Sequence, residues 1–120
     1  MATGILATGT PSATTYTTAY VVPNTTYSVV NVSFTNTGTT AATIRLHIGT
    51  SLGTNAFGSL PTGSLVTTEA IEYDTVVAPK GVFERTGLVI SSTSGAKYIT
   101  VYASTANVNV NIYGIETSTV

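Results

Sequence analysis

Apolar and polar residues alternate with a period of two in several short stretches of the chain. In residues 26–36, for example, Val30, Val32 and Phe34 occupy every second position, and polar residues stand between them. Because successive side chains of an extended chain point to opposite faces, such a stretch predicts a β-strand with one buried face. The stretches with a strand-like pattern are residues 16–22, 26–36, 43–50, 71–77, 82–90, 98–103 and 108–113.

These stretches predict an all-β protein. Turn-forming residues separate them, and no window shows the i, i+3, i+4, i+7 spacing of apolar residues that marks an amphipathic helix. About seven or eight short strands joined by turns are typical of an antiparallel β-sandwich, with Ig-like or jelly-roll-like connections. The core is expected to contain Val30, Val32, Phe34, Ile44, Leu46, Ile99, Val101, Val110 and Ile112.

Residues 71–77 and 82–90 flank a short segment with the composition of a tight turn. In this segment Pro79 presets the backbone φ angle, and Gly81 can adopt a positive φ at little cost. We therefore predict that the two stretches pair as a β-hairpin.

Two acidic residues of this predicted hairpin, Glu72 and Asp74, are expected to share one face of their strand as residues i and i+2. Paired carboxylates can do acid–base chemistry or bind Ca²⁺. The simpler interpretation is a cross-strand ion pair, because Glu84 and Arg85 lie on the predicted partner strand.

The first segment without strand periodicity is at the N-terminus. Residues 1–14 are rich in Gly, Ala, Thr and Pro and contain one apolar pair, Ile5 and Leu6. This composition predicts a flexible arm, which is either a frayed terminus or a segment that docks Ile5 and Leu6 on a neighbouring subunit. The start of the chain has no basic region and no long apolar run, so we expect no signal peptide.

The second such segment is a long loop at residues 49–68, inside an expected single sandwich domain of residues 15–120. A structureless connection in a compact domain is usually no longer than about 12–15 residues. The segment therefore either hides a short hairpin or projects toward a partner. Its large apolar residues are Leu52, Phe57, Leu60 and Leu65.

Composition narrows the classes of function. The 120 residues suffice for one two-layer core, and only 8% of them are charged. No window reaches the ~18 consecutive apolar residues of a membrane-spanning helix. A net charge of −1 with four scattered basic residues provides no surface for nucleic acid. The absence of cysteine rules out disulfides and thiolate ligands and is compatible with assembly in a reducing cytosol.

Candidate chemistry is sparse. His47 is the only histidine, and the alternation places it beside Arg45 on the exposed face of its strand, where we expect it to be solvated. No acidic residue or second histidine recurs near it at strand spacing, as a general base or a metal site would need. We therefore expect no catalytic, cofactor-binding or metal-binding residue, and no enzyme.

Tyrosine supplies seven of the ten aromatic residues. If the last two predicted strands pair, Tyr98, Tyr102 and Tyr113 share one outward face. Tyrosine combines an apolar body with a polar tip, and it is common at protein interfaces and sugar-binding faces. A plain packed second face explains the three tyrosines equally well.

The residues IEYD at 71–74, PKGVFERTGL at 79–88, VYAS at 101–104 and VNIYGIE at 110–116 form a pattern together with YVVP at 20–23 and NTG at 36–38. This pattern resembles small virion structural proteins of tailed phages, especially marine and cyanobacterial ones. The resemblance covers about two-thirds of the chain and consists of strand and turn residues, not of a catalytic signature. It implies a particle component made in the host cytoplasm and located in the virion.

We therefore expect a capsid decoration or cement protein that binds the head shell, with the major capsid protein as its partner. The alternative is a tail, fibre or baseplate module that contacts host surface glycans. A homo-oligomer is expected, and the resemblance favours a trimer. The candidate interface residues are Ile5, Leu6, Leu52, Phe57, Leu60, Leu65, Tyr98, Tyr102 and Tyr113.

Overall fold

A computed structural model describes residues 2–93 and 97–119 of the chain. These residues form nine β-strands and one short 3₁₀ helix. The elements are β1 (Thr3–Gly9), β2 (Thr17–Val21), β3 (Thr26–Asn36), β4 (Ala42–Gly49), β5 (Asn55–Ala56), η1 (Thr67–Glu69), β6 (Ala70–Val77), β7 (Val82–Ser91), β8 (Tyr98–Ala103) and β9 (Val108–Ser118).

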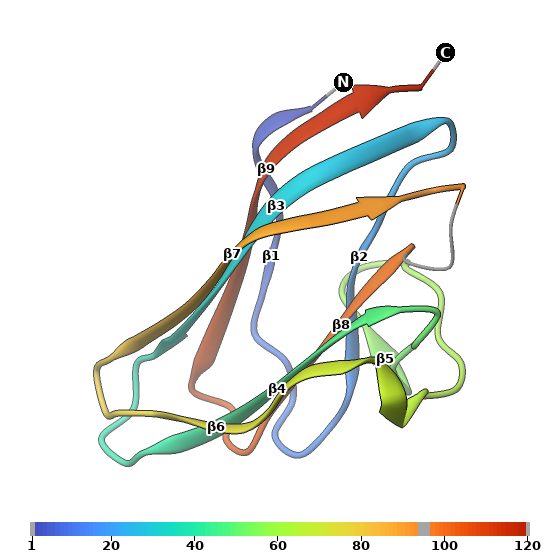
Figure 1. The fold of residues 1–120 in the computed structure, drawn as a ribbon. Helices are drawn as coiled ribbons and strands as arrows, with labels where there is room; N and C mark the ends of the chain where they lie inside the picture. Colours follow the sequence, from blue (N-terminus) through green and yellow to red (C-terminus); the bar gives the residue numbers. More distant parts are fainter. Residues whose placement is uncertain (1, 94–96, 120) are drawn as a thin grey trace.

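The strands form two stacked sheets (Figure 1). The four-stranded sheet has the order β1-β9-β3-β7, and the five-stranded sheet has the order β5-β2-β8-β4-β6. All strand pairs are antiparallel except β2 with the two-residue β5, which are parallel. The prediction of an all-β sandwich is confirmed.

The connections decide between the two predicted topologies. Only the segment from β4 through β5 to β6 stays within one sheet, and every other connection between successive strands crosses to the opposite sheet. Without the short β5, this is the eight-stranded order of a jelly roll. In this topology strands adjacent in sequence are seldom paired in space.

The N-terminal segment is part of a sheet. Residues Thr3–Gly9 form the edge strand β1, which pairs with β9 from Thr3 opposite Ile115 to Gly9 opposite Val110. The predicted flexible arm is therefore wrong for these residues. Backbone hydrogen bonds to β9 order them, although their side chains lack a clear period of two. A register shift between Ile5 and Ala7 accounts for the broken alternation.

The predicted hairpin of residues 71–77 and 82–90 is also wrong. Both strands exist, but β6 pairs with β4 and β7 pairs with β3, so the turn between them crosses from one sheet to the other. The turn itself closes as expected, with a hydrogen bond from the Gly81 amide to the Ala78 carbonyl. A strand–turn–strand pattern predicts a change of direction but not the partner of either strand.

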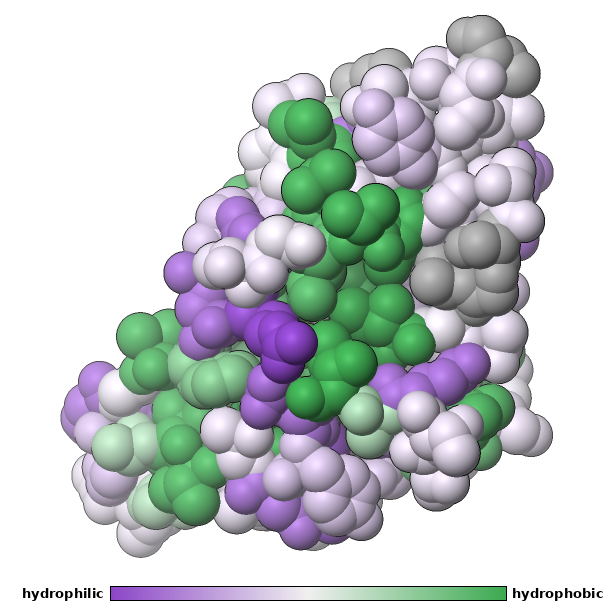
Figure 2. Space-filling model, viewed as in Figure 1, coloured by the Kyte–Doolittle hydropathy of each residue, from purple (hydrophilic) through white to green (hydrophobic). Residues whose placement is uncertain are grey.

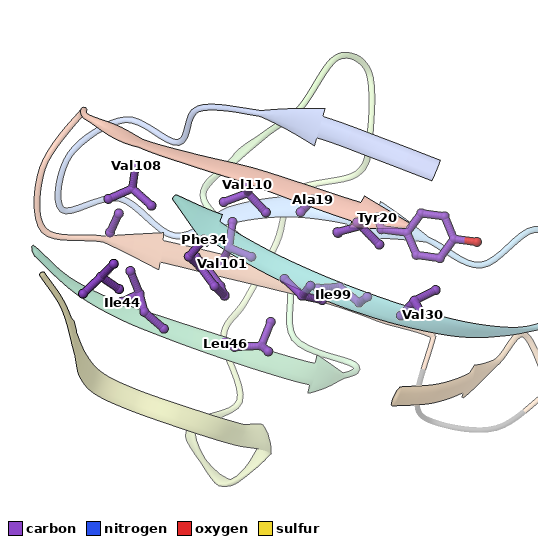
Figure 3. Close-up of a cluster of buried hydrophobic side chains, with 14 of the residues drawn as sticks. Ala19, Tyr20, Val30, Phe34, Ile44, Leu46, Ile99, Val101, Val108 and Val110 are labelled. Carbon is purple, nitrogen blue, oxygen red and sulfur yellow. The ribbon is translucent and has the colours of Figure 1, made fainter. Parts of the chain in front are cut away.

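The core lies between the two sheets, as Figure 3 shows for its central side chains. All nine residues predicted for the core are at most 1% exposed, so that prediction is confirmed. Ala19 and Tyr20 are both buried because a register shift in β2 interrupts the alternation there. The Tyr20 hydroxyl contacts Ser28 and donates a hydrogen bond to the Glu116 carboxylate. The pKa of Tyr20 is raised, mainly because the side chain is buried and secondly because of its hydrogen bond to Glu116.

The long pair of β3 and β9 forms the centre of the four-stranded sheet. Sequence analysis ends the last strand at residue 113, but β9 continues through Gly114 to Ser118. A Cβ atom at Gly114 would lie 2.0 Å from the carbonyl oxygen of Val29. Glycine at this position therefore permits the close approach of β9 to β3.

Candidate functional site

A row of apolar side chains, three of them exposed and the central Val29 half-buried, crosses the outer face of the four-stranded sheet. Val29 on β3 pairs with Val89 on β7 on one side and with Ile115 on β9 on the other. Ile5 on β1 lies diagonally opposite Ile115, because its own partner is Tyr113. Figure 2 shows hydrophobic side chains gathered in a band over the region where β9, β3 and β7 cross in this view. We call Ile5, Val29, Val89 and Ile115 the apolar row.

The apolar row is accessible to solvent. The exposed fraction is 66% for Val89, 63% for Ile5 and 46% for Ile115. A large apolar side chain gains about 1.5–3 kcal/mol when it is fully buried, so this row forgoes a substantial part of that energy in the free chain. Contiguous exposed apolar side chains are typical of docking surfaces, so the apolar row is the candidate functional surface of this sheet.

The outer face of the five-stranded sheet carries a cluster of tyrosines around Arg45. The guanidinium carbon of Arg45 is 4.1 Å from the ring centre of Tyr73 and 4.4 Å from that of Tyr102, within the range of cation–π contacts. Its Nε donates to the Asp74 carboxylate at 2.7 Å, and one terminal nitrogen donates to the Tyr16 hydroxyl at 2.8 Å. The hydrogen bond to Asp74 is the main reason that the pKa of Arg45 is raised.

The three tyrosines expected on one face lie on two different faces. Tyr98 and Tyr102 are on β8 in the five-stranded sheet, whereas Tyr113 is on β9 in the four-stranded sheet. The expectation fails because the connection between β8 and β9 crosses the sandwich. Tyr113 donates its hydroxyl to the Glu84 carboxylate on β7, and this hydrogen bond raises the pKa of Tyr113.

His47 is fully buried, which contradicts the expectation of a solvated residue. Its ring is nearly perpendicular to the ring of Tyr16, with 5.3 Å between the ring centres. Neither ring nitrogen has a hydrogen-bond partner among the described residues. Burial lowers the pKa of His47, so the imidazole is neutral at pH 7. His47 points to the outer face of β4, as predicted, but its side chain is not exposed to solvent there.

Next to His47 on this face, the long loop folds back on the five-stranded sheet and binds Thr100, which is paired with His47. The Thr100 hydroxyl donates to the Ser51 carbonyl at 2.9 Å, and the Gly53 amide donates to the Thr18 hydroxyl at 2.9 Å. Both hydroxyls belong to strands of the sheet, so the start of the loop is attached directly to it. The alternative of a projecting loop is therefore wrong for this part of the segment.

The other alternative, a short hairpin hidden within residues 49–68, is only partly correct. The amide of Leu52 donates to the Ser64 carbonyl, and the amide of Gly63 donates to the Gly53 carbonyl. These bonds join the two arms of the loop, but the strand within it is the two-residue β5, which pairs with β2 instead. The loop is thus closed on itself and attached to the sheet.

Glu69 in η1 anchors the beginning of this loop. Its carboxylate accepts hydrogen bonds from the amides of Thr50 at 2.9 Å and Ser51 at 2.7 Å, and from the Thr50 hydroxyl at 3.0 Å. Burial alone raises the pKa of a carboxyl group, but these hydrogen bonds to the charged form outweigh burial, and the pKa of Glu69 is lowered.

The predicted interface residues therefore differ widely in how exposed they are. Leu6 and Phe57 pack against the core, and Ile5 is the member of the set that is largely exposed. The half-buried members are Leu6, Leu52, Phe57, Leu60, Leu65, Tyr98, Tyr102 and Tyr113. The loop leucines are partly covered within the chain itself, so they have less area to offer a partner than sequence analysis assumes.

The carboxylate pair is divided between two ion pairs. Asp74 binds Arg45 on the outer face of the five-stranded sheet, whereas Glu72 binds Arg85, which comes from the opposite sheet. Asp74 has a positive φ of 54° at a register shift of β6, so the expected common face is lost. Within residues 2–93 and 97–119, no three His, Cys, Asp or Glu side chains gather as a metal site would require.

Apart from Ile5, the exposed members of both outer faces were not predicted from the sequence. Val89 and Ile115 were indistinguishable from core residues, because only the pairing with β3 shows that they face outward. Tyr73 could have been noticed from its place between Glu72 and Asp74, but its contact with Arg45 depends on the pairing of β6 with β4. In the described part of the chain no helix is long and apolar enough to cross a membrane.

Comparison of the chain with protein-family models, with curated proteins and with solved structures gives no match in any of the three.

Proposed function

We propose that this protein is a structural component of a phage particle, and specifically a capsid decoration protein that binds the head shell. The observation that carries this proposal is the apolar row, in which Val89 and Ile5 are each more than 60% exposed, in a chain of which only 8% of the residues are charged. A chain with so little charge has weak electrostatic protection against association, so the exposed apolar row favours a permanent binding partner. The resemblance of residues 71–74, 79–88 and 110–116 to small virion proteins supports the same class.

The proposed partners are the major capsid protein and other copies of this chain. The apolar row replaces the arm and the loop as the main contact, because β1 and the loop are attached to the sandwich. A homotrimer remains the favoured assembly, on the ground of the resemblance alone. Jelly rolls occur in viral capsid proteins but also in lectins and cupins, so the fold by itself does not select this function.

Quantitative mass spectrometry of purified particles tests the proposal. A decoration protein is expected at hundreds of copies per particle, because a shell repeats its lattice positions many times. A few copies per particle would favour the alternative, a tail, fibre or baseplate module. Absence from purified particles would refute both.

The docking surface has its own test. Val89→Ser and Ile115→Ser should weaken both self-association, measured by light scattering, and binding to particles that lack the protein. Val76→Ser is the matched control, since Val76 is 66% exposed but lies on β6 in the other sheet. Equal effects of all three variants would contradict docking through the apolar row.

A further inference from the structure

A shallow hollow lies on the outer face of the four-stranded sheet, over the pair β1 and β9. Its volume is about 310 Å³, and its lining residues are Thr8, Gly9, Thr10, Asn109, Val110 and Asn111. Gly9 and Val110 are paired and form the floor with their backbones. A Cβ at Gly9 would point toward Phe57 inside the sandwich, and Val110 is buried. The walls are thus the polar side chains of the remaining four residues.

These walls offer uncharged hydrogen-bonding groups. The Thr10 hydroxyl donates to the side-chain carbonyl of Asn109 at 2.7 Å, and the Asn109 amide nitrogen has no partner among the residues that the structure describes. The side chain of Asn111 makes no hydrogen bond with another described residue. Because each free amide can both donate and accept, or donate twice, it complements a ligand that carries several hydroxyl groups. No charged residue lines the hollow, so an ion is not its natural ligand.

Tyr113 provides an aromatic surface on the same outer face as this hollow, but on the other side of β9. It follows Asn111 by two positions on β9, and both side chains therefore lie on the outer face. Its hydroxyl binds Glu84 on β7, and β3 lies between β9 and β7 in the sheet. The ring must therefore extend across β3, with one face toward the sheet and the other toward solvent. The hydrogen bond to Glu84 holds it in that position.

We propose that Tyr113, Asn111 and the hollow bind a neutral oligosaccharide. A flat aromatic ring suits the apolar face of a sugar, and the amides and hydroxyls of the hollow suit its hydroxyl groups. From Tyr113 to Asn109 the strand advances by about 13–14 Å, which is enough for two or three linked sugar rings. The inference does not depend on attachment to a capsid, because it concerns the free protein and a different set of side chains.

The test uses the full-length chain and short oligomers of glucose, galactose, mannose and N-acetylglucosamine, first on an array and then by calorimetry. At least one of these should bind the unaltered protein. Tyr113→Ala and Asn111→Ala should each reduce the affinity by about tenfold or more, whereas Tyr113→Phe, which keeps the ring, should reduce it less. Tyr73→Ala is the control, because Tyr73 is exposed on the opposite sheet.

Thermal unfolding of each variant must match that of the parent protein, so that a loss of binding reports the site and not the fold. Failure of every oligosaccharide to bind would overturn the proposal. So would binding that survives both Tyr113→Ala and Asn111→Ala, or binding that is lost only in Tyr73→Ala. None of these results would bear on copy number in the particle, which tests the proposed function separately.

Discussion

Arg85 on β7 and Glu72 on β6 form an ion pair that joins the two sheets at one edge of the sandwich. Both strands are edge strands, and Arg85 also approaches the carbonyl of Ile71. The Glu72 side chain is 18% exposed and that of Arg85 is 42% exposed. The Thr75 hydroxyl donates to the second oxygen of Glu72 at 2.8 Å and fixes the carboxylate. The ion pair thus connects the edge strands β6 and β7, beyond which neither sheet has a further strand among the described residues.

A double-mutant cycle on this pair should give a coupling free energy of about 1 kcal/mol or less, because Arg85 is partly solvated. Glu72→Gln, Arg85→Met and the double variant are compared by urea unfolding. The coupling should decrease at high salt, as expected for a solvent-accessible pair. The control pair Glu84→Gln with Arg85→Met should show no coupling, and equal coupling in both cycles would contradict an inter-sheet ion pair.

Burial of His47 should make stability depend on pH near neutrality. The pKa of His47 is lowered in the folded protein from the usual 6.5, so the unfolded chain binds more protons in this range. The free energy of unfolding should therefore be highest above pH ~6.5, and it should decrease as the pH falls through that value toward the lowered pKa of His47. Urea unfolding across this range measures the effect.

His47→Leu should abolish this pH dependence and should not reduce stability at pH 7, because it removes two buried nitrogens without partners. Glu69→Gln is the matched control. The pKa of Glu69 is lowered from 4.5, so the stability contributed by its carboxylate is lost only as the pH falls below about 4.5. A pH dependence near 6.5 that persists in His47→Leu would show that another group is responsible.

Phe34→Ala should lower the free energy of unfolding by about 3–5 kcal/mol, because the ring is fully buried between the sheets. Val89→Ala should cost far less, since Val89 is 66% exposed. Denaturant unfolding of the free protein compares the two. Similar costs would mean that Val89 is buried in the protein in solution, by self-association or by a different fold.

Gly114→Ala should destabilise the protein by about 3 kcal/mol or more, because the added methyl group would collide with the Val29 carbonyl and separate β9 from β3. Gly58→Ala serves for comparison. Gly58 has a φ of 60° but open space around it. Its replacement should therefore lower the free energy of unfolding only by the strain of a left-handed alanine, about 1–2 kcal/mol. A tolerated Gly114→Ala would contradict the close pairing of the two strands.

The candidate sites show how far sequence reasoning reaches on this chain. Ile5 was identified as an apolar residue outside the core, and it is exposed, but its neighbours in the apolar row were not identified. Tyr113 was named as a surface tyrosine, whereas its orientation across β3 depends on Glu84, far away in the sequence. His47 was assigned to the correct strand face, but its burial and its contact with Tyr16 were not predicted, because they join residues distant in the chain.

The sequence by itself determined seven of the nine strands and the nine core residues that it predicted, but it missed β1 and the two-residue β5. This information is local, because the alternation of side chains follows from backbone geometry within a few residues. Only the tertiary structure decided which strands pair, that β6 and β7 belong to different sheets, and that His47 is buried. These features rest on hydrogen bonds and packing between residues distant in the chain. Strands of similar composition can form them in several combinations, so no short stretch specifies them.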